Sequence, residues 1–330
     1  MRQRREENGD RAAWAAGFFA LAALFLGCTE RRADYCDGTT ACAEPGRPYC
    51  DVQGLLGSRN TCTALCPTSL ACNAVDVNLP YCDLDGALGA PNTCTALCPS
   101  HAACAELYPA RPGCAAGGAC VECVLGSHCG SLVCDRAGNQ CEAEADIIYV
   151  DGAGGVDAGN CPQASPCETI AYALGQVGSN RSIVHVAAGT YAESVTVDGN
   201  VPVRLVGDGA AVTEVNPSSA GDVPGLLVQN GADVTVEGLR FTGATDAAGG
   251  DGVRCESQGS SVTLLAVEVS GNEATGLEAS NCTVTVSQST LSGNAGGGLQ
   301  TTGGAVTVSH STLSGNAWGG LQTTGGAVTI

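Results

Sequence analysis

A 22-residue repeat near the end of the chain constrains its fold more than any other feature. The segment 284–305 reads VTVSQSTLSGNAGGGLQTTGGA and returns nearly unchanged at 306–327, and a looser copy begins at Val262. The Val, Thr, Ser, Gly and Asn of these copies favour strands and turns over helices. In solenoids with repeats of about this length, each coil buries its apolar side chains only against the next coil. We therefore predict an all-β solenoid.

Residues of successive copies align in columns, as stacked parallel strands require. The alternation in Val-Thr-Val places every second side chain inside the coil. Asn272, Asn294 and Asn316 each close a Ser-Gly-Asn turn. Because Asn tolerates a left-handed corner and stacked amides can hydrogen-bond, we interpret this column as a structural ladder rather than a ligand site. The apolar columns are Val262/Val284/Val306/Val328, Leu264/Val286/Val308/Ile330, Val269/Leu291/Leu313 and Leu277/Leu299/Leu321.

A second repeat, rich in cysteine, lies within residues 36–145. The segment 48–72 returns 32 residues later at 80–104, and the shared unit is C-x11-C-x3-C-x5-C. So short a unit buries too little apolar surface to be stable alone, so we predict disulfides, each contributing about 2–4 kcal/mol. Four cysteines per unit allow three pairings, and the spacing does not choose among them. The candidates are Cys50, Cys62, Cys66, Cys72, Cys82, Cys94, Cys98 and Cys104.

A different unit follows at 120–141 and resembles a short cysteine motif of secreted bacterial proteins. Its Cys120-x2-Cys123 has zinc-like spacing, but the later cysteines do not repeat it. Asp83 and Asp85 hint at a calcium loop, but the first copy of the repeat lacks the second acid and no downstream Glu completes the ligand set. We therefore predict no metal and no other cofactor.

The first residues have the composition of an export signal, which we assign to residues 1–27. Four arginines among the first eleven residues precede the uncharged segment 12–27, and Cys28 follows. The apolar segment is shorter than the roughly 20 residues of a membrane-spanning helix. It resembles a bacterial lipoprotein signal, which implies a lipidated Cys28, a linker at 28–35 and an outer-membrane location. The alternative is an ordinary cleaved signal and a secreted protein.

The charge of the chain excludes one class of partner. The 330 residues carry 33 acids against 14 bases, a formal net charge of −19, and every base is an arginine. Nucleic-acid binding needs a basic patch, because it neutralises phosphates. We therefore predict no nucleic-acid partner.

The segment 147–197, which precedes the 22-residue repeat, carries a separate set of motifs. It contains Tyr149-Val150-Asp151, then Thr169-Ile170 at the start of a short helix, and then the strand 184–186 followed by Gly189-Thr190-Tyr191. In these features it resembles the opening of right-handed parallel β-helix proteins of the pectin-lyase-like group. With the repeats, the resemblance covers 146–330 and implies a helix near 168–175 that caps the solenoid. We also expect pairs Cys161–Cys167 and Cys255–Cys282, and a natural chain that continues beyond Ile330.

The resembled group includes polysaccharide lyases and hydrolases, so a catalytic site is a possibility to weigh. A lyase needs a base, often Arg or Lys, beside calcium-binding carboxylates. Arg254 with Asp251 and Asp246 is the best candidate, and a solvated loop is the alternative reading. No pair of acids of the kind that hydrolases use is repeated. From Gly259 onward the only acids or bases are Glu268, Glu273 and Glu278, so an ionised active site is not expected there.

These observations together favour a cell-surface lipoprotein, anchored in outer-membrane lipid through Cys28. The cysteine-rich region would hold the β-helix away from the membrane, and the β-helix would serve in adhesion to a surface protein or in binding of extracellular polysaccharide, without catalysis. The outward columns Thr285/Thr307/Thr329 and Gln300/Gln322 offer hydroxyls and amides for such binding. The alternatives are a polysaccharide lyase or hydrolase, and a structural spacer with no ligand.

Overall fold

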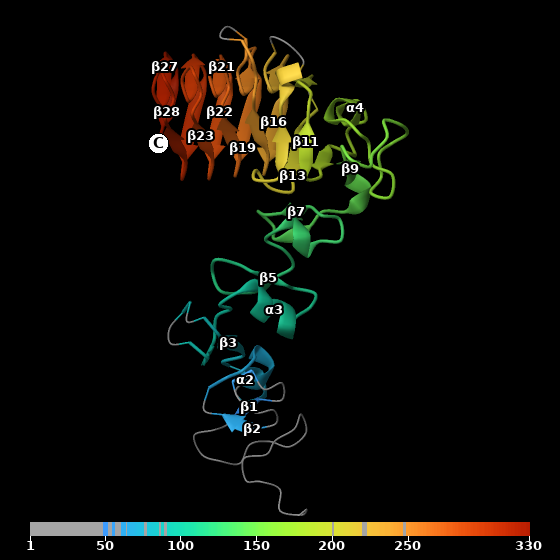
Figure 1. Ribbon diagram of the computed structural model, residues 1–330, viewed down its shortest axis with the longest axis vertical. Coiled ribbons are helices and arrows are strands. Elements are labelled where there is room, and N and C mark those ends of the chain that lie inside the picture. The colour runs from blue at the N-terminus through green and yellow to red at the C-terminus, as the bar shows by residue number, and fades with distance from the viewer. Residues whose placement is uncertain are drawn as a thin grey trace, which may run out of the picture. The chain divides into compact units, whose positions relative to one another are not determined.

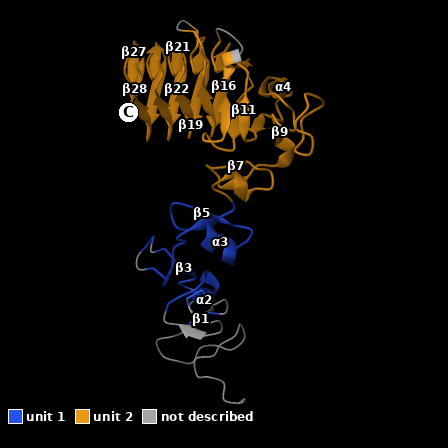
Figure 2. Ribbon diagram, viewed as in Figure 1, with its two compact units in different colours: residues 1–122 blue, residues 123–330 orange. Residues whose placement is uncertain are grey.

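The structure is a computed structural model that describes residues 49–51, 55–56, 61–63, 65–75, 78–85, 87–88, 91–199, 201–219, 223–246 and 249–330. The predicted signal, the predicted anchor Cys28 and the linker 28–35 lie outside these ranges. The chain divides into two compact units, residues 1–122 and residues 123–330 (Figure 2). Among the described residues, no helix is long and apolar enough to cross a membrane.

Short hairpins and helical turns make up the first unit. In each complete hairpin two cysteines face one another across the strands, Cys82 opposite Cys94 and Cys114 opposite Cys120. A helix precedes each of these hairpins. The elements are β1 (Tyr49–Asp51), β2 (Thr61–Thr63), α2 (Ser69–Val75), β3 (Tyr81–Asp83), β4 (Thr93–Thr95), α3 (His101–Leu107), β5 (Gly113–Cys114) and β6 (Cys120–Val121).

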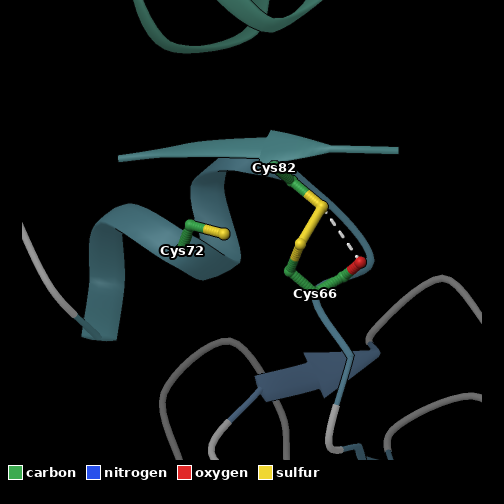
Figure 3. A group of neighbouring side chains, drawn as sticks. All are labelled: Cys66, Cys72 and Cys82. Carbon is green, nitrogen blue, oxygen red and sulfur yellow. Dashed lines mark hydrogen bonds between the residues drawn. A yellow bond between two sulfur atoms is a disulfide. The ribbon is translucent and has the colours of Figure 1, made fainter. Parts of the chain in front are cut away.

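The disulfides define a module that begins at the third cysteine of the sequence repeat. Cys66 bonds to Cys82, and Cys72 on α2 bonds to Cys94, so the first cysteine pairs with the third and the second with the fourth. Figure 3 shows the Cys66–Cys82 bond with Cys72 beside it. The bridges therefore join successive sequence repeats rather than closing each one. The same order recurs in Cys98–Cys114 with Cys104–Cys120 and in Cys123–Cys134 with Cys129–Cys141.

The last of these modules, residues 123–141, packs against the start of the β-helix. Val133 is buried with Tyr149 and Val206, and the Tyr149 hydroxyl donates to the carbonyl oxygen of Ser131 at 3.0 Å. The compact unit consequently starts at Cys123, ahead of residue 146 where the sequence suggested that the β-helix begins. Its small elements are η1 (Gly126–His128), β7 (Cys134–Asp135), β8 (Gln140–Cys141) and η2 (Glu144–Asp146).

Three parallel sheets wind around one core in the second unit (Figure 1). Successive strands of a turn belong to different sheets, and each strand pairs with its equivalent one turn away. Sheet one contains β9 (Ile147–Val150), β10 (Ile183–Val186), β13 (Val203–Gly207), β16 (Asp233–Glu237), β19 (Ser261–Leu265), β22 (Thr283–Ser287), β25 (Ala305–Ser309) and β28 (Ala327–Thr329). Sheet two contains β11 (Gly189–Tyr191), β14 (Thr213–Val215), β17 (Arg240–Thr242), β20 (Glu268–Ser270), β23 (Thr290–Ser292) and β26 (Thr312–Ser314). Sheet three contains β12 (Val195–Asp198), β15 (Leu226–Gln229), β18 (Val253–Cys255), β21 (Leu277–Ser280), β24 (Leu299–Thr302) and β27 (Leu321–Thr324), and η3 (Pro217–Ser219) lies in a loop between sheets.

The strand register follows the 22-residue period. Val262 pairs with Val284, which in turn pairs with Val306, in sheet one. Val262 and Val284 are fully buried, as the alternation in Val-Thr-Val predicts. Earlier turns carry longer loops, so Val234 pairs with Val262 across a wider gap in sequence. The predicted all-β parallel solenoid is confirmed.

The helix α4 (Ile170–Leu174) covers the first end of this core, where the sequence places a capping helix. Ile170 and Ala173 are fully buried against the core side chains. The Thr169 hydroxyl caps the helix by accepting the N–H of Tyr172 at 3.2 Å. The Glu193 carboxylate accepts the N–H groups of Ile170 and Ala171, both at 2.9 Å. These acceptors satisfy the N–H groups that a helix leaves free at its start.

Glycine, not asparagine, forms the left-handed corner of each Ser-Gly-Asn turn. Gly271, Gly293 and Gly315 have φ of 69°, 64° and 66°. The asparagines that follow them do not have positive φ, so the expectation that they adopt the corner conformation is wrong. Gly takes this conformation without a Cβ clash, which leaves the neighbouring Asn in ordinary backbone geometry with its side chain available for other contacts.

Candidate functional site

The predicted asparagine ladder is hydrogen-bonded along its length. The Nδ2 group of Asn272 donates to Oδ1 of Asn294, and that of Asn294 donates to Oδ1 of Asn316, both at 2.9 Å. The same two oxygens also accept the backbone N–H groups of Asn272 and Asn294, at 3.2 and 3.0 Å. Asn272 and Asn294 are 2% and 1% exposed. Their amides are therefore consumed by the fold and do not offer a ligand site.

Both cysteine pairs expected in the second unit are bonded. Cys161 is joined to Cys167 across six residues, and Cys255 to Cys282 across 27. All four side chains are fully buried. The first bridge ties the loop before α4, and the second joins consecutive turns of the β-helix.

The structure brings Arg254 and Asp251 into direct contact. Nε and Nη2 of Arg254 donate to Oδ2 of Asp251 at 2.8 and 2.5 Å, and Nη2 also donates to the carbonyl oxygen of Gly249 at 2.9 Å. The other oxygen of Asp251 accepts the N–H of Thr275 at 2.9 Å, and Asp251 is only 1% exposed. The pair thus fastens the loop before β18 to the next turn, because both partners bind backbone groups as well as each other.

Two more carboxylates complete this cluster, and only one of them lies close to Arg254 in sequence. Arg254 Nε lies 3.9 Å from Oε1 of Glu256 and 3.7 Å from Oε2 of Glu278. Burial and a hydrogen bond with Asp251 raise the pKa of Glu278 above its ordinary value, although Arg254 acts in the opposite direction. Glu278 is the Cα partner of Arg254 one turn on, so knowledge of the register would have revealed the contact.

Asp246 lies earlier in the same loop and is held by a different contact. Its backbone N–H donates to Oε2 of Glu273 at 2.8 Å, and its φ is 92°. The cluster around Arg254 is therefore built chiefly from Asp251, Glu256 and Glu278, with Asp246 held beside the following turn.

Arg240 and Arg204 also lie between two carboxylates each. Arg240 on sheet two lies 3.5 Å from Glu214 and 3.4 Å from Glu268. Arg204 on sheet one donates to Glu142 at 2.8 Å and to Glu237 at 3.2 Å. These pairings are not apparent from the sequence, because their members lie far apart along the chain. A guanidinium surrounded by carboxylates remains charged and is a poor general base.

Arg204 also links the last cysteine module to the β-helix. It donates to the carbonyl oxygen of Cys134 at 2.7 Å, and Arg136 of the module forms an ion pair with Glu237. Since Glu237 is nearly buried, the two arginines compensate a carboxylate that would otherwise be costly to bury.

The cysteine sulfurs lie close enough together for a metal site, but they are already bonded in disulfides. Three trios place their sulfur atoms within 4.8 Å of one another. Every one of these sulfurs is in a disulfide, whereas zinc binds thiolates. Cys120 and Cys123 belong to different modules, so they do not act as a CxxC unit, and the sequence grouping of 120–141 is corrected to 123–141. The trios are Cys66/Cys72/Cys82, Cys98/Cys104/Cys114 and Cys123/Cys129/Cys141.

Asp83, weighed above for a calcium loop, acts as a buried acceptor for its own loop. Its two carboxylate oxygens accept the N–H groups of Ala87 and Leu88, both at 2.7 Å. Asp51 binds Leu55 and Leu56 in the same way in the previous repeat. The aspartate is thus a loop-forming residue common to both repeats.

The outer surfaces of sheets one and three are polar and uncharged from residue 284 onward. Thr285, Thr307 and Thr329 are successive Cα partners on sheet one, and Gln300 and Gln322 are partners on sheet three. Thr307 and Thr329 are exposed, and the two glutamines are partly exposed. Hydroxyls and amides therefore recur once per turn at the strand spacing of about 4.8 Å.

A family model matches most of the second unit. Residues 182–330 match a family model described as the right handed beta helix region. A search of curated proteins gives no match. Among solved structures, Escherichia coli YbhC is 12% identical with a TM-score of 0.35, covering 51% of this chain and 57% of its own. A pectin methylesterase from Aspergillus niger is 13% identical with a TM-score of 0.34, covering 57% of this chain and 86% of its own, and one from carrot is 13% identical with a TM-score of 0.27, covering 54% and 63%. The chain thus spans little more than half the length of the Escherichia coli protein. The family match, together with the three parallel sheets, shows that the second unit contains a right-handed parallel β-helix.

Proposed function

We propose that this chain is an exported cell-surface protein whose β-helix binds extracellular polysaccharide without cleaving it. The observation that carries the proposal is the in-register Thr column on sheet one and Gln column on sheet three, which present hydroxyls and amides once per turn. A regular array of this kind suits a polymer that repeats its own hydroxyls. The predicted lipid on Cys28 would hold the protein at the outer membrane, where it would encounter extracellular polysaccharide.

A glycan array probed with the full chain tests this proposal. We expect retention on at least one class of polysaccharide, and reduced retention when Thr307 and Gln300 are both changed to Ala. Binding to no glycan at all would contradict the proposal and favour the structural spacer.

Polysaccharide cleavage at the Arg254 cluster is the second candidate function, and one observation favours it. The raised pKa of Glu278 beside Asp251 would suit a general acid. Against it, Arg254 is held by Asp251 and by the carbonyl oxygen of Gly249, and a guanidinium is a poor general base. Incubation with acidic polysaccharide, followed by ultraviolet detection of unsaturated ends, tests for a lyase. A reducing-sugar assay tests for a hydrolase, and activity lost in Glu278→Gln would support catalysis.

A further inference from the structure

Two substitutions distinguish the turn 306–327 from the turn 284–305 before it. The copies 284–305 and 306–327 differ only where Gln288 becomes His310 and where Gly296 becomes Trp318. Trp318 is 60% exposed, and among the described residues of the second unit it is the one exposed Phe, Tyr or Trp. Replacement of a glycine by the largest side chain, within an otherwise preserved turn, adds apolar surface that the core does not use.

Trp318 lies in the loop between β26 and β27, beside the glutamine column. The backbone N–H of Trp318 donates to the carbonyl oxygen of Gly296 at 3.1 Å, and this bond stacks the loop on that of the previous turn. The side-chain amide of Gln322 donates to the carbonyl oxygen of Trp318. Gln322 is the Cα partner of Gln300. The backbone of Trp318 is thus bound by Gln322, and Gln300 lies one turn earlier in the same column of sheet three.

The chemistry of this surface selects a class of ligand. The face of an indole ring packs well on an apolar surface, such as the C–H face of a pyranose ring, while amides bind hydroxyls. Beyond Glu278 the chain contains no Asp, Glu, Arg or Lys. Without a cation to pair with a carboxylate, and with acidic residues on the preceding turns, the surface disfavours acidic sugars.

We propose that Trp318, Gln322 and Gln300 form a subsite for a sugar ring of a neutral polysaccharide. The inference rests on the proposed carbohydrate-binding function and assigns it a place and a ligand class. The indole would stack on the ring, and the glutamines would bind its hydroxyls.

The indole itself reports binding. The chain has two tryptophans, Trp14 and Trp318, so the full-length variant Trp14→Phe leaves Trp318 as the sole source of tryptophan fluorescence. Titration with cello-oligosaccharides and xylo-oligosaccharides should change its emission saturably. Oligogalacturonates, as the acidic probe, should bind about tenfold more weakly or not at all. Tighter binding of the acidic probe would overturn the neutral ligand class.

Reversion of the two substitutions provides matched variants. Trp318→Gly restores the residue of the previous turn and should weaken retention on cellulose or xylan by about tenfold or more. His310→Gln restores the other difference and should leave retention unchanged. If the wild type is retained and Trp318→Gly is retained equally well, the subsite is overturned while the proposed function stands. Failure of the wild type to bind any glycan would overturn both, with circular dichroism showing that each variant is folded.

Discussion

The asparagines of the ladder hydrogen-bond to one another and to backbone groups of the neighbouring turns. Asn294 connects the amides above and below it, and its Nδ2 group also donates to the carbonyl oxygen of Val269 at 3.2 Å. Asn294→Ala leaves several of these groups unpaired, so we expect a loss of about 2–3 kcal/mol in the free energy of unfolding. Urea denaturation measures this loss. Thr307→Ala, on the exposed outer face, should change stability by less than about 0.5 kcal/mol, and equal effects of the two variants would argue against the ladder.

Asp208 gives the protein a contribution to stability that depends on pH. The hydrogen bond from His185, with Nε2 and Oδ1 3.0 Å apart, lowers the pKa of Asp208 below its ordinary value of 3.8. A carboxyl with a lowered folded-state pKa stabilises the fold above pH 3.8, and this contribution is lost as the pH falls through the folded-state pKa.

The change Asp208→Asn should therefore lower the melting temperature at neutral pH, and the difference from the wild type should shrink as the pH falls below 3.8. Thermal unfolding between neutral and acid pH measures this. The exposed Asp146→Asn serves as the control. A difference for Asp208→Asn that does not vary with pH would exclude the assigned charge effect.

Single residues show how far the sequence could be interpreted. The positions of the asparagine column followed from the repeat, because equivalent residues of a solenoid stack. The use of Gly293 for the corner did not follow, since both residues of a Gly-Asn pair can adopt positive φ. The binding of Arg254 by Asp251 was suggested by proximity, but the approach of Glu278 depended on an exact register across a loop of irregular length.

At the scale of elements, the two disulfides of the β-helix form a natural comparison. Both are buried, but Cys255–Cys282 closes a separation of 27 residues and Cys161–Cys167 one of six. Loop-closure entropy predicts that the longer bridge stabilises by about 3.5 kcal/mol and the shorter by about 2 kcal/mol. Replacement of each pair by Ala, followed by denaturant unfolding, should give losses in that order. A larger loss for the shorter bridge would contradict the entropic account.

The cysteine modules show why element boundaries were harder to predict than elements. A tandem repeat has no intrinsic starting point, so the unit C-x11-C-x3-C-x5-C could equally begin at its third cysteine. The hairpins determine where the module begins, because they place Cys82 opposite Cys94 and within reach of Cys66 and Cys72. The docking of 123–141 was likewise hidden, since it depends on contacts of Arg204 with residues far away in sequence.

At the scale of the whole molecule, the proposal of a cell-surface protein depends on Cys28. If this residue carries lipid, the expressed protein should enter the detergent phase in a phase-partition experiment, and Cys28→Ser should move it to the aqueous phase. Thr29→Ser is the matched control and should partition like the wild type. Unchanged partitioning of Cys28→Ser would leave secretion through an ordinary signal as the explanation.

For the whole molecule, the sequence predicts the fold better than it predicts the function. The period of 22 residues predicted the solenoid, because a parallel β-helix repeats its hydrophobic columns turn by turn. The outer surface carries no such constraint, so the columns of Thr and Gln and the exposed Trp318 define a chemistry rather than a named ligand. The buried apolar columns therefore predict the fold, whereas the function has to be argued from the groups on the outer surface.

In the proposed function, the β-helix holds a neutral polysaccharide without cleaving it. The most direct test incubates the full chain with insoluble cellulose and xylan, and measures both the protein retained and the sugar released. We predict retention that saturates with protein concentration, and no released sugar above the level of a protein-free control. Soluble oligosaccharides that accumulate with time, and that disappear in Arg254→Ala, would contradict the claim and identify an enzyme.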